Sequence, residues 1–154
     1  DGGTWNTTIT PADSGAGTPD TSTGVTLNDL QALAVSATIS YGSVSNGANS
    51  TGDHTATVTN TGNTAIDFKT SGANLTCSTL GTIPKENQEY SLISFTYGTG
   101  TDLSATPTDV NADLAAPAVA TVPVTDATYW QIAVPNGVSG TCSGDITFTA
   151  EAAL

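Results

Sequence analysis

Apolar and polar residues alternate over most of the chain after residue 30, and this period of two is typical of β-strands. The longest alternation covers residues 33–41, in which Leu33, Val35, Ile39 and Tyr41 share one parity. Shorter alternations follow at residues 55–59, 66–68, 75–77, 93–97, 110–114, 130–134 and 142–150. Turn residues such as Asn46-Gly47 and the run 60–63 separate them. Apart from residues 25–34, which also allow a helical turn, no stretch has a helical period.

These strands predict an all-β fold, a single antiparallel β-sandwich of jelly-roll or immunoglobulin-like type. A chain of 154 residues is long enough to bury the core of one such domain. Residues 115–124 are apolar but contain Pro117 and Pro123, which cannot donate to a ladder. We therefore expect that stretch to be a sheet edge or a connector.

The first 24 residues differ from the rest. Trp5, Thr7 and Ile9 alternate as in a short strand, and residues 11–24 have the Pro, Gly, Ser and Thr content of a linker. We expect two parts, an N-terminal donor strand with its linker at 1–24 and a sandwich domain at 25–154. The strand has no obvious local partner. It either pairs or frays within its own chain, or it packs into another molecule.

Composition excludes several classes of function. The chain has two basic residues (Lys plus Arg) and 14 acidic residues (Asp plus Glu), which gives a net charge of −12. We therefore do not expect it to bind nucleic acid. No apolar run reaches the ~18 residues of a membrane span. His54 is the only histidine, and Asp102, Asp109 and Asp113 lack the spacing of a calcium loop. We expect no enzyme activity, no cofactor and no metal site.

The two cysteines, Cys77 and Cys142, are compatible with one disulfide formed in an oxidising compartment. The chain begins at Asp1 and contains no Met, so we expect a mature, secreted protein whose targeting segment has been removed. Three Asn-x-Ser/Thr sequons, at Asn6, Asn49 and Asn74, are possible N-glycosylation sites.

Several stretches together resemble uncharacterised secreted β-sandwich proteins of bacteria and archaea. They include residues 41–44 (YGSV), 58–63 (VTNTGN), 87–90 (NQEY), 129–135 (YWQIAVP) and 140–144 (GTCSG). At the level of the fold, the layout is similar to archaeal bundling pilins and bacterial biofilm-matrix fibre subunits. That analogy implies a jelly-roll body with an N-terminal strand donated to the neighbouring subunit.

We therefore expect a structural subunit of an extracellular filament or pilus, whose partners are other copies of itself. Trp5, Thr7 and Ile9 have the period of a strand added to a sheet edge. The receiving groove is expected to be lined by six strand residues: Val35, Ile39, Ile132, Val134, Ile146 and Phe148. The alternative is a monomeric adhesive or glycan-binding module on a cell surface.

Overall fold

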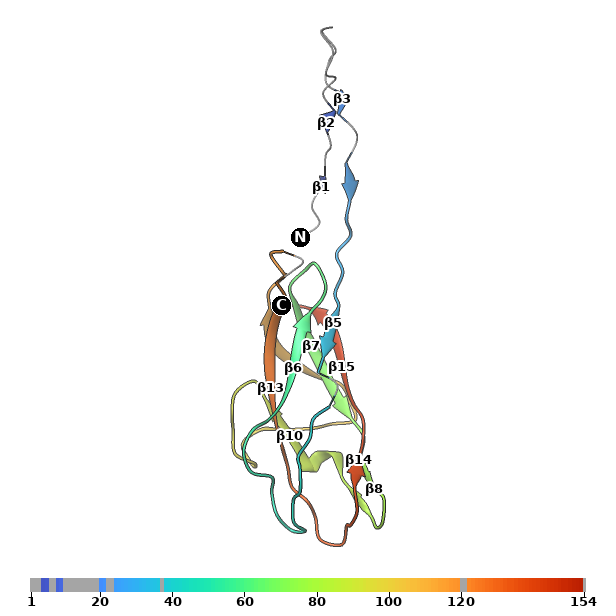
Figure 1. Cartoon of the computed structure of the whole chain (residues 1–154), viewed down its shortest axis with the longest axis vertical. Coiled ribbons are helices and arrows are strands. Elements are labelled where there is room, and N and C mark those ends of the chain that lie inside the picture. The colour runs from blue at the N-terminus through green and yellow to red at the C-terminus, as the bar shows by residue number, and fades with distance from the viewer. Residues whose placement is uncertain are drawn as a thin grey trace.

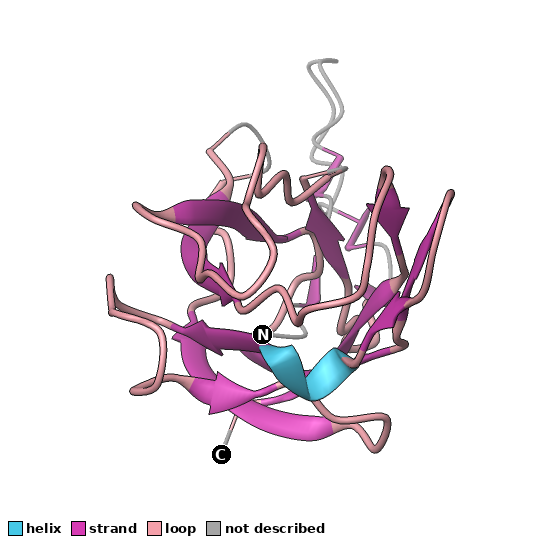
Figure 2. Ribbon diagram, turned by 90° about the horizontal axis from the view of Figure 1, so that it is seen from below, coloured by secondary structure: helices cyan, strands magenta, loops and turns pink. Residues whose placement is uncertain are grey.

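The computed structural model describes residues 4–5, 8–9, 20–21, 24–36, 38–119 and 122–153. Within these residues the fold is all-β and every strand pair is antiparallel, as the alternation predicted. The only helical element in the described ranges is the 3₁₀ turn η1 (Lys85–Asn87). Seen from below, the strands surround a common interior (Figure 2).

Three sheets build the sandwich (Figure 1). The larger layer has the order β11 (Thr101–Asp102), β10 (Gln88–Ser91), β13 (Val124–Ile132), β6 (His54–Asn60), β5 (Leu33–Val35). The opposing layer has the order β12 (Thr108–Leu114), β7 (Ile66–Gly72), β15 (Ile146–Ala152). A small third sheet has the order β14 (Cys142–Ser143), β8 (Leu75–Cys77), β9 (Thr82–Ile83).

The main core lies between the two larger layers. Trp130 on β13 and Phe68 on β7 are fully buried, together with Ile66 and Val58. The Trp130 indole donates to the Thr128 hydroxyl at 2.8 Å, so its one polar atom is satisfied inside the core. A second cluster of Leu75, Cys77, Ile83, Ile132 and Val138 fills the end that contains the third sheet.

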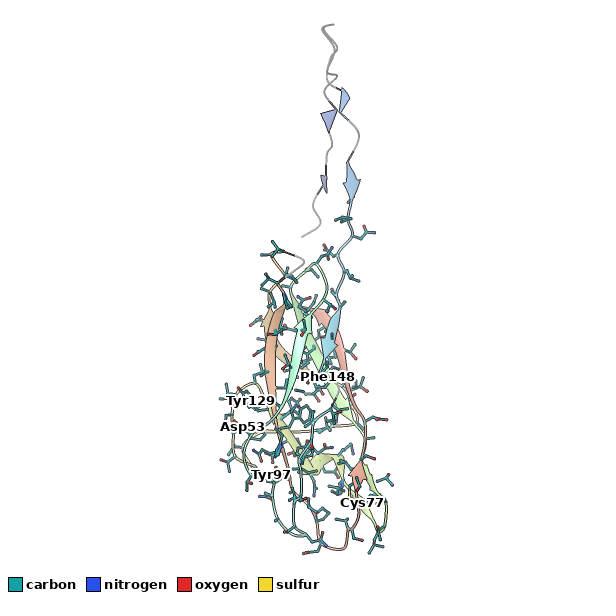
Figure 3. All side chains as sticks on the ribbon, in the orientation of Figure 1. Asp53, Cys77, Tyr97, Tyr129 and Phe148 are labelled. Carbon is teal, nitrogen blue, oxygen red and sulfur yellow. A yellow bond between two sulfur atoms is a disulfide. The ribbon has the colours of Figure 1, made fainter. Side chains whose placement is uncertain are left out.

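The predicted disulfide is present and joins Cys77 to Cys142. The two residues are direct partners in the antiparallel register of β8 and β14. Cys77 lies near one end of the molecule (Figure 3), which we call the disulfide end. The opposite end, from which residues 24–32 leave the sandwich, is called the arm end (Figure 1).

The N-terminal residues that the structure describes pair with one another. β1 (Thr4–Trp5) pairs with β4 (Val25–Thr26), and β2 (Thr8–Ile9) pairs with β3 (Asp20–Thr21). Each ladder joins only two residue pairs. Both lie beyond the arm end in Figure 1, and we call the segment of residues 4–32 the arm. The ladders of the sandwich itself begin at Leu33, eight residues after the predicted domain boundary.

Two strand predictions need correction. Residues 93–97 were predicted as a strand, but they form a loop in which Ile93 is 72% exposed. The buried Glu89 carboxylate orders this loop by accepting hydrogen bonds from the Gly98 and Gly100 amides at 2.8–3.0 Å. The strand of this region is β10, which carries few apolar residues and gave no alternation.

The second correction concerns the longest alternation. Residues 33–41 were predicted as one strand, but only Leu33–Val35 pair with β6. After the Ser36 amide donates to the Thr57 carbonyl, residues 38–44 belong to no ladder. Ala37 lies outside the described residues. The apolar parity nevertheless holds, because Val35, Ile39 and Tyr41 all pack against the core.

Candidate functional site

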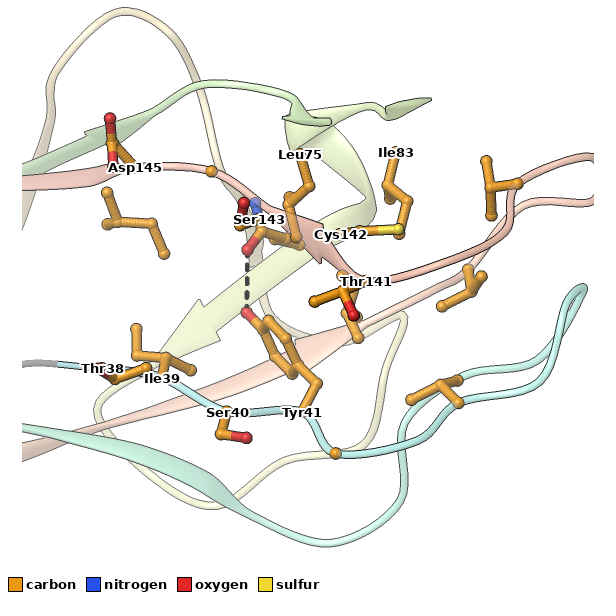
Figure 4. A pocket seen from close by; sticks show the side chains of 18 of the residues that line it. Thr38, Ile39, Ser40, Tyr41, Leu75, Ile83, Thr141, Cys142, Ser143 and Asp145 are labelled. Atoms are coloured by element: carbon orange, nitrogen blue, oxygen red, sulfur yellow. Dashed lines mark hydrogen bonds between the residues drawn. The ribbon is translucent and has the colours of Figure 1, made fainter. Parts of the chain in front are cut away.

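A groove of about 1000 Å³ opens along one side of the sandwich. One wall is the segment 35–46, which continues from β5. The other wall is the segment 139–148, which contains β14 and the start of β15 (Figure 4). Leu75, Ile83 and Ile132 form its floor. We call it the β5–β15 groove.

The groove exists because both layers end there. β5 is the last strand of the larger layer, and β15 is the last strand of the opposing layer. In the described residues, β15 pairs with β7 on one side only, and residues 38–44 pair with no strand. Two edges with unpaired backbone groups therefore face the same hollow, and such edges are templates for an added strand.

The walls carry both polar and apolar side chains, and the apolar ones continue into the interior. Val35, Ile39, Ile146 and Phe148 are partly buried and contact the main core. The Phe148 ring lies 5.6 Å from Phe68, so the groove is continuous with the interior. An occupant with apolar side chains at every second position would extend the core of the sandwich.

Tyr41 is the aromatic residue of the 35–46 wall, which serine and threonine side chains also line (Figure 4). Its hydroxyl donates to Gln88 Oε1 at 3.1 Å, and its ring meets His54 edge-on with centroids 5.2 Å apart. Burial raises the pKa of the Tyr41 hydroxyl well above its ordinary value, so the group stays neutral and can hydrogen-bond. His54 is half-buried against this ring.

All six residues predicted for the groove line it: Val35, Ile39, Ile132, Val134, Ile146 and Phe148. The structure thus brings together residues from three distant stretches of the chain. Whether a strand enters there stays a prediction. Tyr41, Leu75, Ile83 and Val138 also line the groove and were not predicted. Tyr41 shares the parity of Val35 and Ile39, a signal that identifies it, whereas Val138 follows a turn and gives none.

The donor residues are placed only in part. Trp5 belongs to β1 and Ile9 to β2, while Thr7 lies outside the described residues. The ladders to β4 and β3 correspond to the pairing within one chain that the sequence left open. Of the sequons, Asn6 lies outside the described residues and Asn49 and Asn74 are exposed. Asn74 Oδ1 accepts a hydrogen bond from the Lys85 amide.

A smaller hollow of about 440 Å³ lies between the loops 49–53 and 94–97. Asp53 and Tyr97 line it, and Figure 3 shows both on the same flank of the molecule. Burial raises the pKa of the Tyr97 hydroxyl, and the carboxylates of Glu89 and Asp102 add to the shift. The buried side chain of Gln131 forms part of the wall of this hollow. Its Oε1 accepts a hydrogen bond from the Ser50 hydroxyl, and its Nε2 donates to the Gly52 carbonyl, which ties the loop 49–53 to β13.

We also searched the described residues for metal-binding clusters and membrane-spanning helices. Those residues contain no cluster of three metal-ligating side chains, and Asp109 contacts Lys69 across the β12–β7 ladder. None of their helices is long and apolar enough to cross a membrane. No protein-family model, no curated protein and no solved structure matches this chain.

Proposed function

We propose that the protein is the repeating subunit of an extracellular filament, in which the arm of one copy fills the β5–β15 groove of the next. The observation that carries this proposal is the groove itself, a hollow with a row of apolar side chains that is bordered by the outer edges of two layers. A strand placed there completes both the core and a ladder, which is how an added strand binds a sheet edge.

The residues along these edges support the proposal. Monomeric sandwiches usually guard their edges with charges, prolines or bulges. Residues 35–45 contain no charged residue and no proline, and residues 146–150 of β15 contain none either, although Asp145 and Glu151 flank them. The opposite edge strand, β12, carries Asp109 and Asp113 and has an irregular register between Val110 and Leu114. The edges at the groove are therefore less guarded than the β12 edge.

The direction of the chain also supports head-to-tail assembly. The arm leaves at one end of the sandwich, and the groove runs toward the disulfide end, where Ser139 and Gly140 line it. Residues 24–32 therefore lead away from the groove of their own chain. Because donor and acceptor are different surfaces, the contact is head-to-tail, and it extends into a fibre where the rotation between copies does not close a ring.

The proposal is tested by charge substitutions of opposite parity in the donor segment. Trp5→Asp with Ile9→Asp places two carboxylates on the face expected to enter the groove. Thr4→Asp with Thr8→Asp adds the same charge to the other face and is the matched control. We expect the wild type and the control to form filaments by negative-stain microscopy, and the Trp5/Ile9 variant to stay monomeric by light scattering.

Two results would contradict the proposal. Equal polymerisation of both variants would show that the parity of the arm does not matter. A wild type that stays monomeric at every concentration and ionic strength would exclude self-assembly. In that case the adhesive or glycan-binding alternative becomes the better hypothesis, and a glycan array is the next measurement.

A further inference from the structure

The base of the arm is bound to the sandwich by backbone hydrogen bonds that continue beyond the end of β5. The regular ladder ends where Leu33 pairs with Asn60. Past that point, the Thr61 amide donates to the Ala32 carbonyl at 3.0 Å, and the Asn63 amide donates to the Leu30 carbonyl at 3.0 Å. The β6–β7 turn thus acts as an extra length of edge for residues 28–32.

The Asn63 side chain completes this pairing. Its Oδ1 accepts from the Leu30 amide at 2.6 Å, and its Nδ2 donates to the Asn28 carbonyl at 3.0 Å. One carboxamide therefore supplies the acceptor and the donor that a neighbouring strand would offer. With the Asn63 main-chain amide, this one residue makes three hydrogen bonds to the arm base.

Gly62 and Asn60 give the turn the conformation that these hydrogen bonds require. A Cβ on Gly62 would lie 2.0 Å from the Leu30 carbonyl oxygen, so no other residue lets the arm approach so closely. Asn60 is buried, and its Nδ2 donates to the Thr64 and Ala115 carbonyls while its Oδ1 accepts from the Gly62 amide. The turn is thereby fixed to the sandwich as well as to the arm.

These contacts contribute little to the core. Leu27 and Leu30 are 46% and 56% exposed, and both Asn63 side-chain bonds to the arm lie at the surface. What the bonds do is fix the direction of residues 28–32 relative to β6. Fixing residues 28–32 leaves the arm base less conformational freedom to lose when the arm enters a partner.

We propose that residues 60–63 form a clamp that sets the direction of the arm, and that Asn63 is a positioning residue which determines the stiffness of the filament. The statement about stiffness rests on the proposed function, whereas the clamp itself exists in the single subunit. The two can therefore be measured separately.

The test uses full-length Asn63→Ala, with Asn111→Ala, an exposed position on β12, as the matched control. In monomers, amide exchange and ¹⁵N relaxation should show the Leu30 amide exchanging at least tenfold faster and residues 24–32 losing order. In filaments, the persistence length measured from micrographs should fall at least twofold. The urea midpoint of the sandwich should shift little, and the control should match the wild type in all three.

Asn63→Asp provides a graded variant, because it keeps the acceptor for the Leu30 amide but loses the donor to Asn28. We expect it to lie between the wild type and Asn63→Ala. Unchanged exchange at Leu30 in Asn63→Ala would overturn the clamp. Faster exchange with an unchanged persistence length would overturn the role in stiffness. If the wild type forms no filaments, the proposed function and the role in stiffness fail together, and the exchange result still decides whether the clamp exists.

Discussion

Removing the disulfide should cost a large part of the stability of the sandwich. Cys77 and Cys142 are 65 residues apart in sequence, so the crosslink restricts a long loop in the unfolded chain. The chain-entropy relation gives about 4 kcal/mol for a loop of this length at 25 °C. Domains of this size unfold with about 5–15 kcal/mol, so the loss is a substantial fraction of the total.

The perturbation is best made as the double variant Cys77→Ala and Cys142→Ala. Cys77 is buried beside Leu75 and Ile83, and a serine there would add the separate cost of burying a hydroxyl. Urea unfolding followed by circular dichroism should give a free energy of unfolding lower by about 4 kcal/mol. The free energy of unfolding should also depend more steeply on urea concentration, because the unfolded chain without a crosslink exposes more surface.

Wild-type protein unfolded in the presence of a reductant is the independent comparison, and it should match the double variant closely. The same reductant should not affect the double variant. A loss below about 1 kcal/mol in both experiments would refute the reasoning from loop entropy. It would show that the short β8–β14 ladder and its neighbouring turns already restrain these strands, or that the unfolded chain is compact without the crosslink.

Three further predictions concern other contacts. Burial raises the pKa of Tyr41, so its contribution to the free energy of unfolding is complete below the unfolded pKa of 10.0 and is lost as the pH rises toward the folded-state pKa. The free energy of unfolding, measured by urea titration at pH 8 and pH 11, should therefore fall between these two values. It should fall less steeply in Tyr41→Phe, and an equal fall in both proteins would contradict the argument. Glu89→Gln removes part of the carboxylate that accepts from Gly98 and Gly100, and it should cost about 1–3 kcal/mol and expose residues 92–100 to proteolysis, with the exposed Asp102→Asn as control. Filament formation should require less protein at 0.5 M than at 0.05 M NaCl, because salt screens the repulsion between subunits of charge −12; an opposite trend in light scattering would contradict this.

The sequence predicted the strands that bury one regular face. β6, β12 and most of β15 alternate between the core and the outside, and this period is visible in the residues themselves. β7 departs from it because Asp67 is buried between Ile66 and Phe68. β10 was missed because Gln88 and Glu89 are buried polar residues, whose hydrogen bonds replace an apolar pattern. The loop 93–97 was mistaken for a strand because alternation alone does not show that a partner strand is present.

Parity predicted which strand residues face the interior, but not the shape of the hollow that they line. Parity identified Val35, Ile39, Ile146 and Phe148 as facing the interior, and the structure places all four along one hollow. That residues 38–44 have no strand beside them depends on which strands become the last of each layer. The clamp was also hidden, because Gly62 and Asn63 read as ordinary turn residues until the chain that crosses them is known.

The structure also defines what donation must overcome. In a single chain, the arm forms two ladders of two residue pairs each, and short two-stranded ribbons are marginally stable in water. Residues 146–150 of β15 offer a longer edge, and burying a Trp covers about 150–250 Å², an upper estimate of about 4–6 kcal/mol. Association itself costs about 4–15 kcal/mol, and the charge of −12 adds repulsion. These opposing contributions are of similar size, so protein concentration and salt should decide whether the arm pairs with its own chain or enters a neighbour.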